Sequence, residues 1–286
     1  MNKSQLDKFV TEKDVDSVLH KLRRYGLSIV PNYLDENLIK TLKTEFDKAI
    51  ITDHSSISEK YDHPTNENGK VTRISAYHKN AKKEFPSIIN LFFDPFMENI
   101  SKLFFSPHKF DFNEVIICSH ELSSKKKILP WHFDRIQSLK FWFYLNNVSD
   151  KNGSLKYSPG SHWEGKYRAG YHLLQGKTVG DIPNDIDDDL IQNPISINLN
   201  AGDLLIFDSD GFHAGGVVKS GNERKVLRAH TYPSQFRKYK DKIFSKGWWL
   251  TSRLNLSKIF SSKGMRVIGS KMKDKTINRR ENFPKS

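Results

Sequence analysis

Hydrophobic positions in the first fifty residues recur at the spacing of amphipathic helices. In residues 12–24 the apolar side chains fall on one helical face, behind a threonine, Thr11, that can cap the helix; they are Val15, Val18, Leu19 and Leu22. The segment GLSIVPNYL then predicts a short strand that ends at Pro31, and ENLIKTLKTEFDKAI predicts a second amphipathic helix. Residues 52–84 are polar and turn-rich, and DHPTNENGK is typical of a loop.

From about residue 110 the pattern changes to short runs that are rich in β-branched and aromatic residues. The runs are DFNEVIICS, SLKFWFYLN, GSLKYS, ISINL, DLLIFD, AGGVVK and KVLRAHTY, and turn signals such as DKNG, SPGSH, NAGD and KSGN separate them. Many short strands at this spacing predict a sandwich or barrel rather than a parallel sheet with crossover helices. Residues 164–194 have the character of a long insertion, which is typical of a functional lid or a disordered loop.

We therefore expect one domain over residues 1–236, with a helical N-terminal part (1–109) and a β core (about 110–236). A basic extension, residues 237–286, follows; it holds 15 lysines and arginines against three acidic residues, so it carries almost all of the net charge of +13. Such a tail can meet an anionic membrane surface or a phosphorylated substrate, or it can be a solvated extension that keeps the protein soluble. We predict no specific nucleic-acid partner.

The composition excludes several classes of protein. The single cysteine, Cys118, rules out an internal disulfide framework and a cysteine-based zinc site, and its flanks EVIICSH predict a buried position in a strand. The N-terminus MNKSQLDKFVTEKD lacks the apolar stretch of a secretion signal, and no apolar run is long enough to span a membrane. We expect a cytoplasmic protein, with peripheral membrane association through the tail as an open alternative.

The first segment that could form a functional site is LPWHFDRIQ, in which only Phe133 separates His132 from Asp134. Alternate residues of a strand project to the same side, so these two side chains can clamp a metal ion or form an ordinary buried salt bridge. A second histidine, His213, lies in LLIFDSDGFHAGG, before small residues that allow close approach. Two histidines and one carboxylate form the facial triad of non-haem Fe(II) oxygenases, which leaves metal positions open.

An arginine follows this second histidine at a distance of eleven residues. Arg224 opens the run ERKVLRAHTY, and its planar fork is suited to binding a carboxylate such as the far end of 2-oxoglutarate. Strand alternation places Arg228 on the same face, so it is a geometric substitute for Arg224. Either arginine, taken alone, is equally consistent with ordinary surface charge.

Four motifs occur in a fixed order along the chain: WHFD, NGSLKYSPGSH at residues 152–162, AGDLLIFDSDGFHAGG and ERKVLRAHTY. Together they resemble the phytanoyl-CoA dioxygenase family of Fe(II)/2-oxoglutarate oxygenases, over residues of about 130–232. The N-terminal GLSIVPNYLDENLIKTLKTEF resembles the opening strand and helix of that family. Residues 237–286 carry no such resemblance.

The resemblance implies a double-stranded β-helix, a jelly-roll type of barrel with flanking helices. It also implies Fe(II) held by His132, Asp134 and His213, with 2-oxoglutarate and O2 as cosubstrates. Arg224 matches the cosubstrate arginine, and Trp142 stands where the family often lines the cosubstrate pocket. The carboxylate of Asp134, which related halogenases replace with a small residue, implies hydroxylation or another oxidation, with release of succinate and CO2.

Two other classes of function remain open from the residues alone. One is a metal-binding barrel that has lost turnover, and the other is a zinc hydrolase that uses the same three ligands. Fe(II) and 2-oxoglutarate, mixed without oxygen, give a weak visible charge-transfer band only in a site competent for oxygenase chemistry. We expect a small-molecule or acyl substrate with contacts from the loops 62–80 and 164–194, and the sequence does not specify it further.

Overall fold

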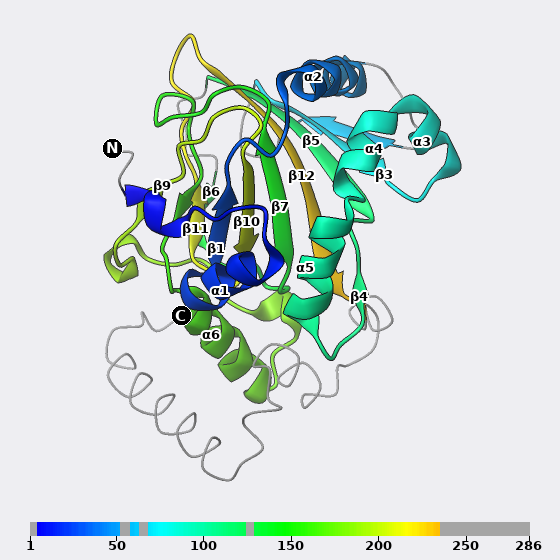
Figure 1. Ribbon diagram of the computed structural model, residues 1–286. Coiled ribbons are helices and arrows are strands. Elements are labelled where there is room, and N and C mark those ends of the chain that lie inside the picture. Colours follow the sequence, from blue (N-terminus) through cyan, green and yellow to red (C-terminus); the bar gives the residue numbers. More distant parts are fainter. Residues whose placement is uncertain (1–4, 52–57, 63–67, 124–128, 235–286) are drawn as a thin grey trace.

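The computed structural model describes residues 5–51, 58–62, 68–123 and 129–234, with only the backbone described in 58–62. The basic extension predicted to meet a membrane or an anionic substrate lies outside these residues. Two antiparallel sheets form the centre of the fold (Figure 1). The larger follows the order β1 (Leu27–Val30), β10 (Leu204–Asp208), β7 (Leu139–Tyr144), β12 (Glu223–Pro233), β5 (Val115–Leu122), β3 (Lys70–Ser75) and β2 (Ser58–Asp62), and β4 (Phe110–Asp111) pairs with β12.

The smaller sheet has the order β6 (Leu129–His132), β11 (His213–Gly215), β8 (Lys156–Tyr157) and β9 (Ile195–Ser196). It lies on one side of the larger sheet, and helices lie on the other side (Figure 1). These helices are α2 (Glu36–Ile51), α3 (Lys79–Glu84), α4 (Pro86–Phe92) and α5 (Pro95–Phe105). Helix α1 (Val15–Tyr25) lies beside β1, and α6 (His162–Leu174) lies below the smaller sheet.

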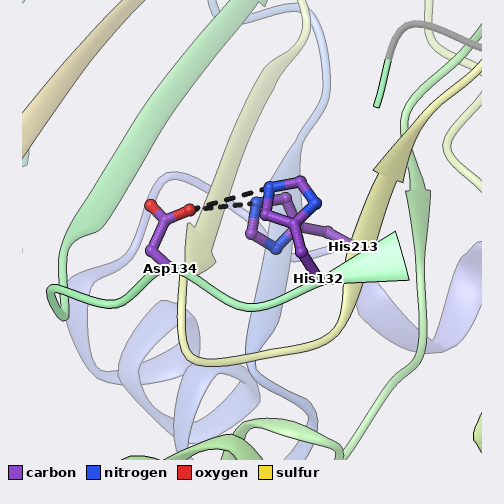
Figure 2. Close-up of side chains that lie close together, drawn as sticks. All are labelled: His132, Asp134 and His213. Carbon is purple, nitrogen blue, oxygen red and sulfur yellow. Dashed lines mark ion pairs between the residues drawn. The ribbon is translucent and has the colours of Figure 1, made fainter. Parts of the chain in front are cut away.

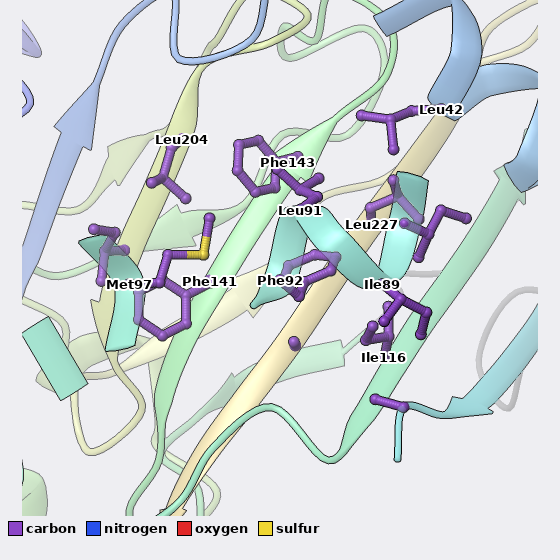
Figure 3. Packing of buried hydrophobic residues seen from close by; sticks show 14 of the residues in the cluster. Leu42, Ile89, Leu91, Phe92, Met97, Ile116, Phe141, Phe143, Leu204 and Leu227 are labelled. Carbon is purple, nitrogen blue, oxygen red and sulfur yellow. The ribbon is translucent and has the colours of Figure 1, made fainter. Parts of the chain in front are cut away.

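Alternation along the strands of the larger sheet separates two chemical environments. On the helix side, apolar residues pack into one core with the helices, among them Phe141, Phe143, Leu227, Phe92 and Met97 (Figure 3). The opposite side faces the smaller sheet and carries an apolar cluster with Trp142, Tyr144 and Phe207. Charged and polar groups share this inner side, because every second residue of a strand projects there. The candidate site therefore lies between this inner side and the smaller sheet, while the helix side supplies the main core.

Several boundaries differ from the sequence prediction. The N-cap of α1 is Asp14, whose carboxylate accepts the Ser17 N–H, and the predicted cap Thr11 instead lies buried against Ser28. The polar, turn-rich stretch 52–84 contains β2, β3 and α3, and β3 lies within 62–80, which is predicted to be a loop. The predicted insertion 164–194 begins inside α6 and continues through two short 3-10 helices, Val179–Asp181 and Asp188–Leu190.

These stretches escaped prediction because their apolar positions are few and are buried by distant segments. In β3, for example, Val71 and Ile74 are buried although their neighbours Lys70 and Arg73 are exposed. Cys118 is a buried free thiol, as predicted, and burial raises its pKa. Among the described residues no helix has the length and hydrophobicity needed to cross a lipid bilayer.

Tyr157 of β8 connects the smaller sheet to β1 and β10. Its hydroxyl lies 3.0 Å from the Gly26 carbonyl oxygen and 3.1 Å from that of Asp208. The ring packs directly on Gly211, where a Cβ atom would collide with it. Gly26 itself ends α1 with a left-handed backbone, at φ 80°.

The change Tyr157→Phe should lower the free energy of unfolding by about 1 kcal/mol, because a buried hydrogen bond is lost while the packing is kept. Urea denaturation measures this value. Tyr171→Phe on α6 is the matched control and should change it by less than about 0.5 kcal/mol. Equal stability of the Tyr157 variant and the wild type would contradict this role.

Candidate metal centre

His132 and His213 lie directly opposite each other on neighbouring strands. His132 ends β6, His213 begins β11, and the two are register partners in the antiparallel pair. Their imidazole rings lie with centroids 4.3 Å apart (Figure 2). Side chains of directly opposed residues project to the same face of a sheet. Strand pairing therefore brings together two residues that are 81 positions apart in the sequence.

Each histidine is held in the same tautomer by its own backbone. His132 Nδ1 lies 2.8 Å from the Pro130 carbonyl oxygen, and His213 Nδ1 lies 2.8 Å from that of Gly211. A carbonyl oxygen can only accept, so Nδ1 carries a proton in both rings, and Nε2 is the nitrogen that faces the centre of the cluster. This arrangement orients imidazole ligands in metal sites.

Asp134 completes the cluster from the loop that follows β6. Its backbone N–H donates to the Ser209 carbonyl oxygen at 2.9 Å, which fixes the loop against the end of β10. Its Oδ1 atom lies 3.5 Å from His213 Nε2 and 3.9 Å from His132 Nε2 (Figure 2). Ligand atoms of the three residues all lie within 4.8 Å of one another. The predicted triad is thus assembled in space.

The protonation states suit a divalent cation. Burial, reinforced by His213 and opposed by Asp134, lowers the pKa of His132 to about 3, so its imidazole is neutral near pH 7. Burial alone would raise the pKa of Asp134, but the Lys140 ammonium, 2.8 Å from its carboxylate, holds it well below its usual range. Two neutral imidazoles and one carboxylate are the ligand set that first-row metals such as iron accept, with other positions left open. The residues fit a metal ion of this class.

Two charged residues of the inner side were missed by the sequence reasoning. Lys140 of β7 is buried, and its Nζ atom lies 2.8 Å from Asp134 Oδ2 and 3.3 Å from His213 Nε2. Glu121 of β5 is buried opposite Arg224. The available signal was a charged residue inside an otherwise apolar strand, in SLKFWFYLN and EVIICSHEL. A buried charge needs a partner, and each run therefore implies an internal ion pair.

Arg224 lies on the inner side, where the sequence pattern places it. Its Nε donates to Glu121 Oε2 at 2.8 Å, and its two terminal nitrogens contact the same carboxylate and the Gly153 carbonyl oxygen. Ser119 Oγ also bonds Glu121, at 3.0 Å from Oε1. The guanidinium has five N–H donors, so donors remain for a further acceptor.

Trp142 lies between this arginine and the triad. The centroid of the Trp142 ring lies 6.0 Å from that of Phe207 and 6.2 Å from that of Tyr144. The Phe207 ring in turn lies 5.5 Å from the His213 ring. The Arg228 guanidinium stacks on Trp142 at 4.9 Å from the ring centroid. Both predicted cosubstrate residues, Arg224 and Trp142, therefore lie on the inner side of the larger sheet, which faces the smaller sheet that carries both histidines, and Arg228 lies there too.

His132→Ala and His213→Ala should each weaken binding of Co(II), used as a stable stand-in for Fe(II), by more than about 100-fold. Mutation of a residue that only hydrogen-bonds to a metal ligand typically lowers the metal affinity 10–100-fold, so loss of a ligand itself should lower it further. Isothermal titration calorimetry measures the affinity, with His172→Ala on α6 as the matched control. Wild-type affinity in either triad variant would remove that histidine from the ligand set.

Comparisons with known proteins agree with this geometry. Among solved structures, the epimerase SnoN in complex with Fe3+, alpha ketoglutarate and nogalamycin RO is 17% identical, with a TM-score of 0.54 over 76% of this chain and 83% of that one. The alpha ketoglutarate dependent carbocyclase SnoK is 15% identical, with a TM-score of 0.55 over 75% and 82%. HygX from Streptomyces hygroscopicus, with nickel, 2-oxoglutarate and hygromycin B bound, is 12% identical, with a TM-score of 0.50 over 76% and 86%.

These similarities establish the fold: the two facing antiparallel sheets are those of the jelly-roll class, as predicted. No curated protein matches the chain. The model of the phytanoyl-CoA dioxygenase (PhyH) family matches residues 22–226, which include the triad, Trp142 and Arg224. The chain belongs to the phytanoyl-CoA dioxygenase family.

Proposed function

We propose that the protein is an Fe(II)- and 2-oxoglutarate-dependent dioxygenase that hydroxylates an unactivated C–H bond of a small-molecule or acyl substrate. The observation that carries the proposal is the cluster of His132, Asp134 and His213, with both Nε2 atoms and one carboxylate oxygen directed at one point. Iron bound there would supply the oxidative decarboxylation of 2-oxoglutarate to succinate and CO2, coupled to oxidation of the substrate.

The chain's own residues bind and orient the reactants, and they exclude water from the site. Phe207 and Trp142 form an apolar wall beside His213, so an oxidising centre there is shielded from solvent. The carboxylate of Asp134 is kept ionised, and its presence favours hydroxylation over halogenation. Neither rival class uses the arginines of the inner face in its chemistry: a hydrolase and a non-catalytic barrel both leave Arg224 with only its ion pair to Glu121.

We further propose that Arg224 binds the distal carboxylate of 2-oxoglutarate, with Trp142 lining the cosubstrate pocket. Support comes from the position of both residues on the inner face, with Trp142 between Arg224 and the triad. A carboxylate bound to Arg224 would share the guanidinium with Glu121, so the cosubstrate enters a site that already holds an internal ion pair.

Two further arginines of the larger sheet, Arg228 and Arg73, favour a substrate that carries an anionic group. Arg228 and Arg73 occupy one row across the larger sheet, since both are register partners of Ile117 on β5. Burial and Asp134 raise the pKa of Tyr232, and Arg228 and Arg73 lower it, so Asp134 and both arginines act on this one side chain. Positive charge of this kind raises the rate of encounter with an anion. We propose that the substrate carries a carboxylate or phosphate.

The decisive experiment incubates the Fe(II)-loaded protein with 2-oxoglutarate, O2 and a panel of candidate substrates, and measures succinate. Substrate-stimulated succinate release with a product heavier by one oxygen atom supports the proposal. Absence of the anaerobic Fe(II)–2-oxoglutarate charge-transfer band in a metal-loaded protein would contradict it. A hydrolysis product formed without O2 would instead favour the zinc-hydrolase alternative.

Arg224→Ala should raise the 2-oxoglutarate concentration needed for half-maximal charge-transfer absorbance by several hundredfold or more. Losing one partner of a buried charge pair typically costs about 3–5 kcal/mol, which corresponds to that range. Arg228→Ala is the matched control and should have a much smaller effect. The double variant Glu121→Gln/Arg224→Ala removes the orphaned carboxylate and keeps the binding defect readable if the single variant is unstable. A larger effect at Arg228 would reassign the cosubstrate arginine.

We propose that the basic extension, residues 237–286, associates with an anionic membrane surface or attracts an anionic substrate. The observation is its charge separation from the rest of the chain, together with Trp248 and Trp249 beside lysines. Deletion of residues 258–286 should abolish sedimentation with anionic vesicles and spare turnover of a soluble substrate if the tail binds lipid. Lower turnover with weaker salt dependence indicates substrate attraction, and no change in either assay contradicts both roles.

A further inference from the structure

Lys140 and Asp134 form an ion pair between the two sheets, and this pair uses only one oxygen of the carboxylate. Lys140 projects from β7 of the larger sheet and bonds Oδ2 at 2.8 Å, whereas Oδ1 is the oxygen that faces both imidazoles. The two oxygens of Asp134 are thus divided between the ammonium and the metal position. A carboxylate held in this way can offer a metal one oxygen atom.

The contact between Lys140 and His213 has a different character. Nζ lies 3.3 Å from His213 Nε2, and that nitrogen has one lone pair, since Nδ1 carries the proton. A metal ion at the triad would take this lone pair, and Lys140 would keep only its bond to Asp134 Oδ2. The ammonium is otherwise enclosed: its residue is 8% exposed, and it lies 5.5 Å from the centre of the Phe207 ring.

Four charges of the inner face form two ion pairs, and Lys140 belongs to the pair at the metal centre. Glu121 balances Arg224, and Asp134 is balanced by Lys140. The two positive charges of a divalent ion would then match the two carboxylates of 2-oxoglutarate. Arg228 adds a further positive charge to this face, where it stacks on Trp142. Removal of Lys140 therefore takes away the positive charge that directly contacts Asp134, and a carboxylate left without its partner in a buried site is costly.

We propose that Lys140 is a positioning residue of the metal centre: it restricts Asp134 to one metal–oxygen bond and supplies the positive charge that lets a dianionic keto acid bind. The first part concerns the chain and the metal alone, and the second rests on the proposed function. Together the two parts predict that a lysine variant keeps its metal affinity, changes its metal coordination and binds the cosubstrate more weakly.

The test compares Lys140→Met with Lys140→Arg and with Lys166→Met. Lys166 is the matched control, because it is equally buried and bonds the buried Asp208 at 2.7 Å, in a pair that excludes the triad. Visible absorption of the Co(II)-loaded proteins reports metal affinity and coordination, and the anaerobic Fe(II) charge-transfer band reports 2-oxoglutarate affinity. Thermal unfolding of each variant reports the structural cost common to both lysines.

Lys140→Met should bind Co(II) at least as tightly as the wild type, because a neighbouring cation is removed. Its Co(II) spectrum should change as Asp134 engages the metal with both oxygens. Its 2-oxoglutarate affinity should fall by about tenfold or more, the size expected when one unit charge is lost at a partly screened site. Lys140→Arg should restore most of this affinity, and Lys166→Met should keep the wild-type spectrum and affinity.

A wild-type Co(II) spectrum with wild-type 2-oxoglutarate affinity in Lys140→Met would overturn the proposal. Loss of Co(II) binding in a folded Lys140→Met variant would overturn it as well, since Lys140 would then be needed to build the site. If the wild type binds Co(II) but gives no charge-transfer band with Fe(II) and 2-oxoglutarate, the proposed function fails, and the Co(II) spectra still decide the role of Lys140 at Asp134.

Discussion

The pairing of β6 with β11 is the constraint on which the metal centre depends, because it sets His132 opposite His213. Neither strand is long, and the register shifts between His213 and Gly215, so the alignment is local to the strand ends. Two backbone carbonyls then fix both rings in one tautomer, and the short loop after β6 returns Asp134 to the same point. A slip of one residue in this pair would turn a histidine to the other face.

Burial of charged side chains on the inner face of the larger sheet costs free energy, and pairing of these charges offsets it. Three strands place buried charged side chains on this face: Glu121 on β5, Lys140 on β7 and Arg224 on β12. Lys140 with Asp134 and Arg224 with Glu121 are cross-strand or cross-sheet ion pairs, so the charges are compensated before any ligand binds. Burial also lowers the pKa of His230, assisted by Lys140 and Arg228, which keeps that ring neutral. The apolar helix side supplies the stability that such a face lacks.

The fold class and the triad could be predicted because both depend on patterns that are visible in the sequence alone. The strand runs alternate, and His132, Asp134 and His213 stand in motifs with a fixed order. Sequence reasoning missed β3 and α6 because their buried positions depend on packing against distant segments.

The same limit explains the charged residues that sequence reasoning left unassigned. The partner of Lys140 lies six residues earlier, in the loop after a strand of the other sheet, and Glu121 meets Arg224 only through the register of β5 and β12. Such contacts are set by topology, which no local pattern encodes. Thr11 does not cap α1, because Asp14 lies directly before the first turn and its carboxylate accepts the Ser17 N–H.

X-ray absorption at the iron edge of the anaerobic Fe(II)-loaded protein tests the central claim most directly, before and after 2-oxoglutarate is added. The account predicts one iron per chain, with scattering from two imidazoles and a single oxygen from Asp134. Addition of 2-oxoglutarate should replace water by the chelate while both imidazoles stay. An iron shell with fewer than two imidazoles, or one that loses an imidazole when 2-oxoglutarate binds, would contradict it.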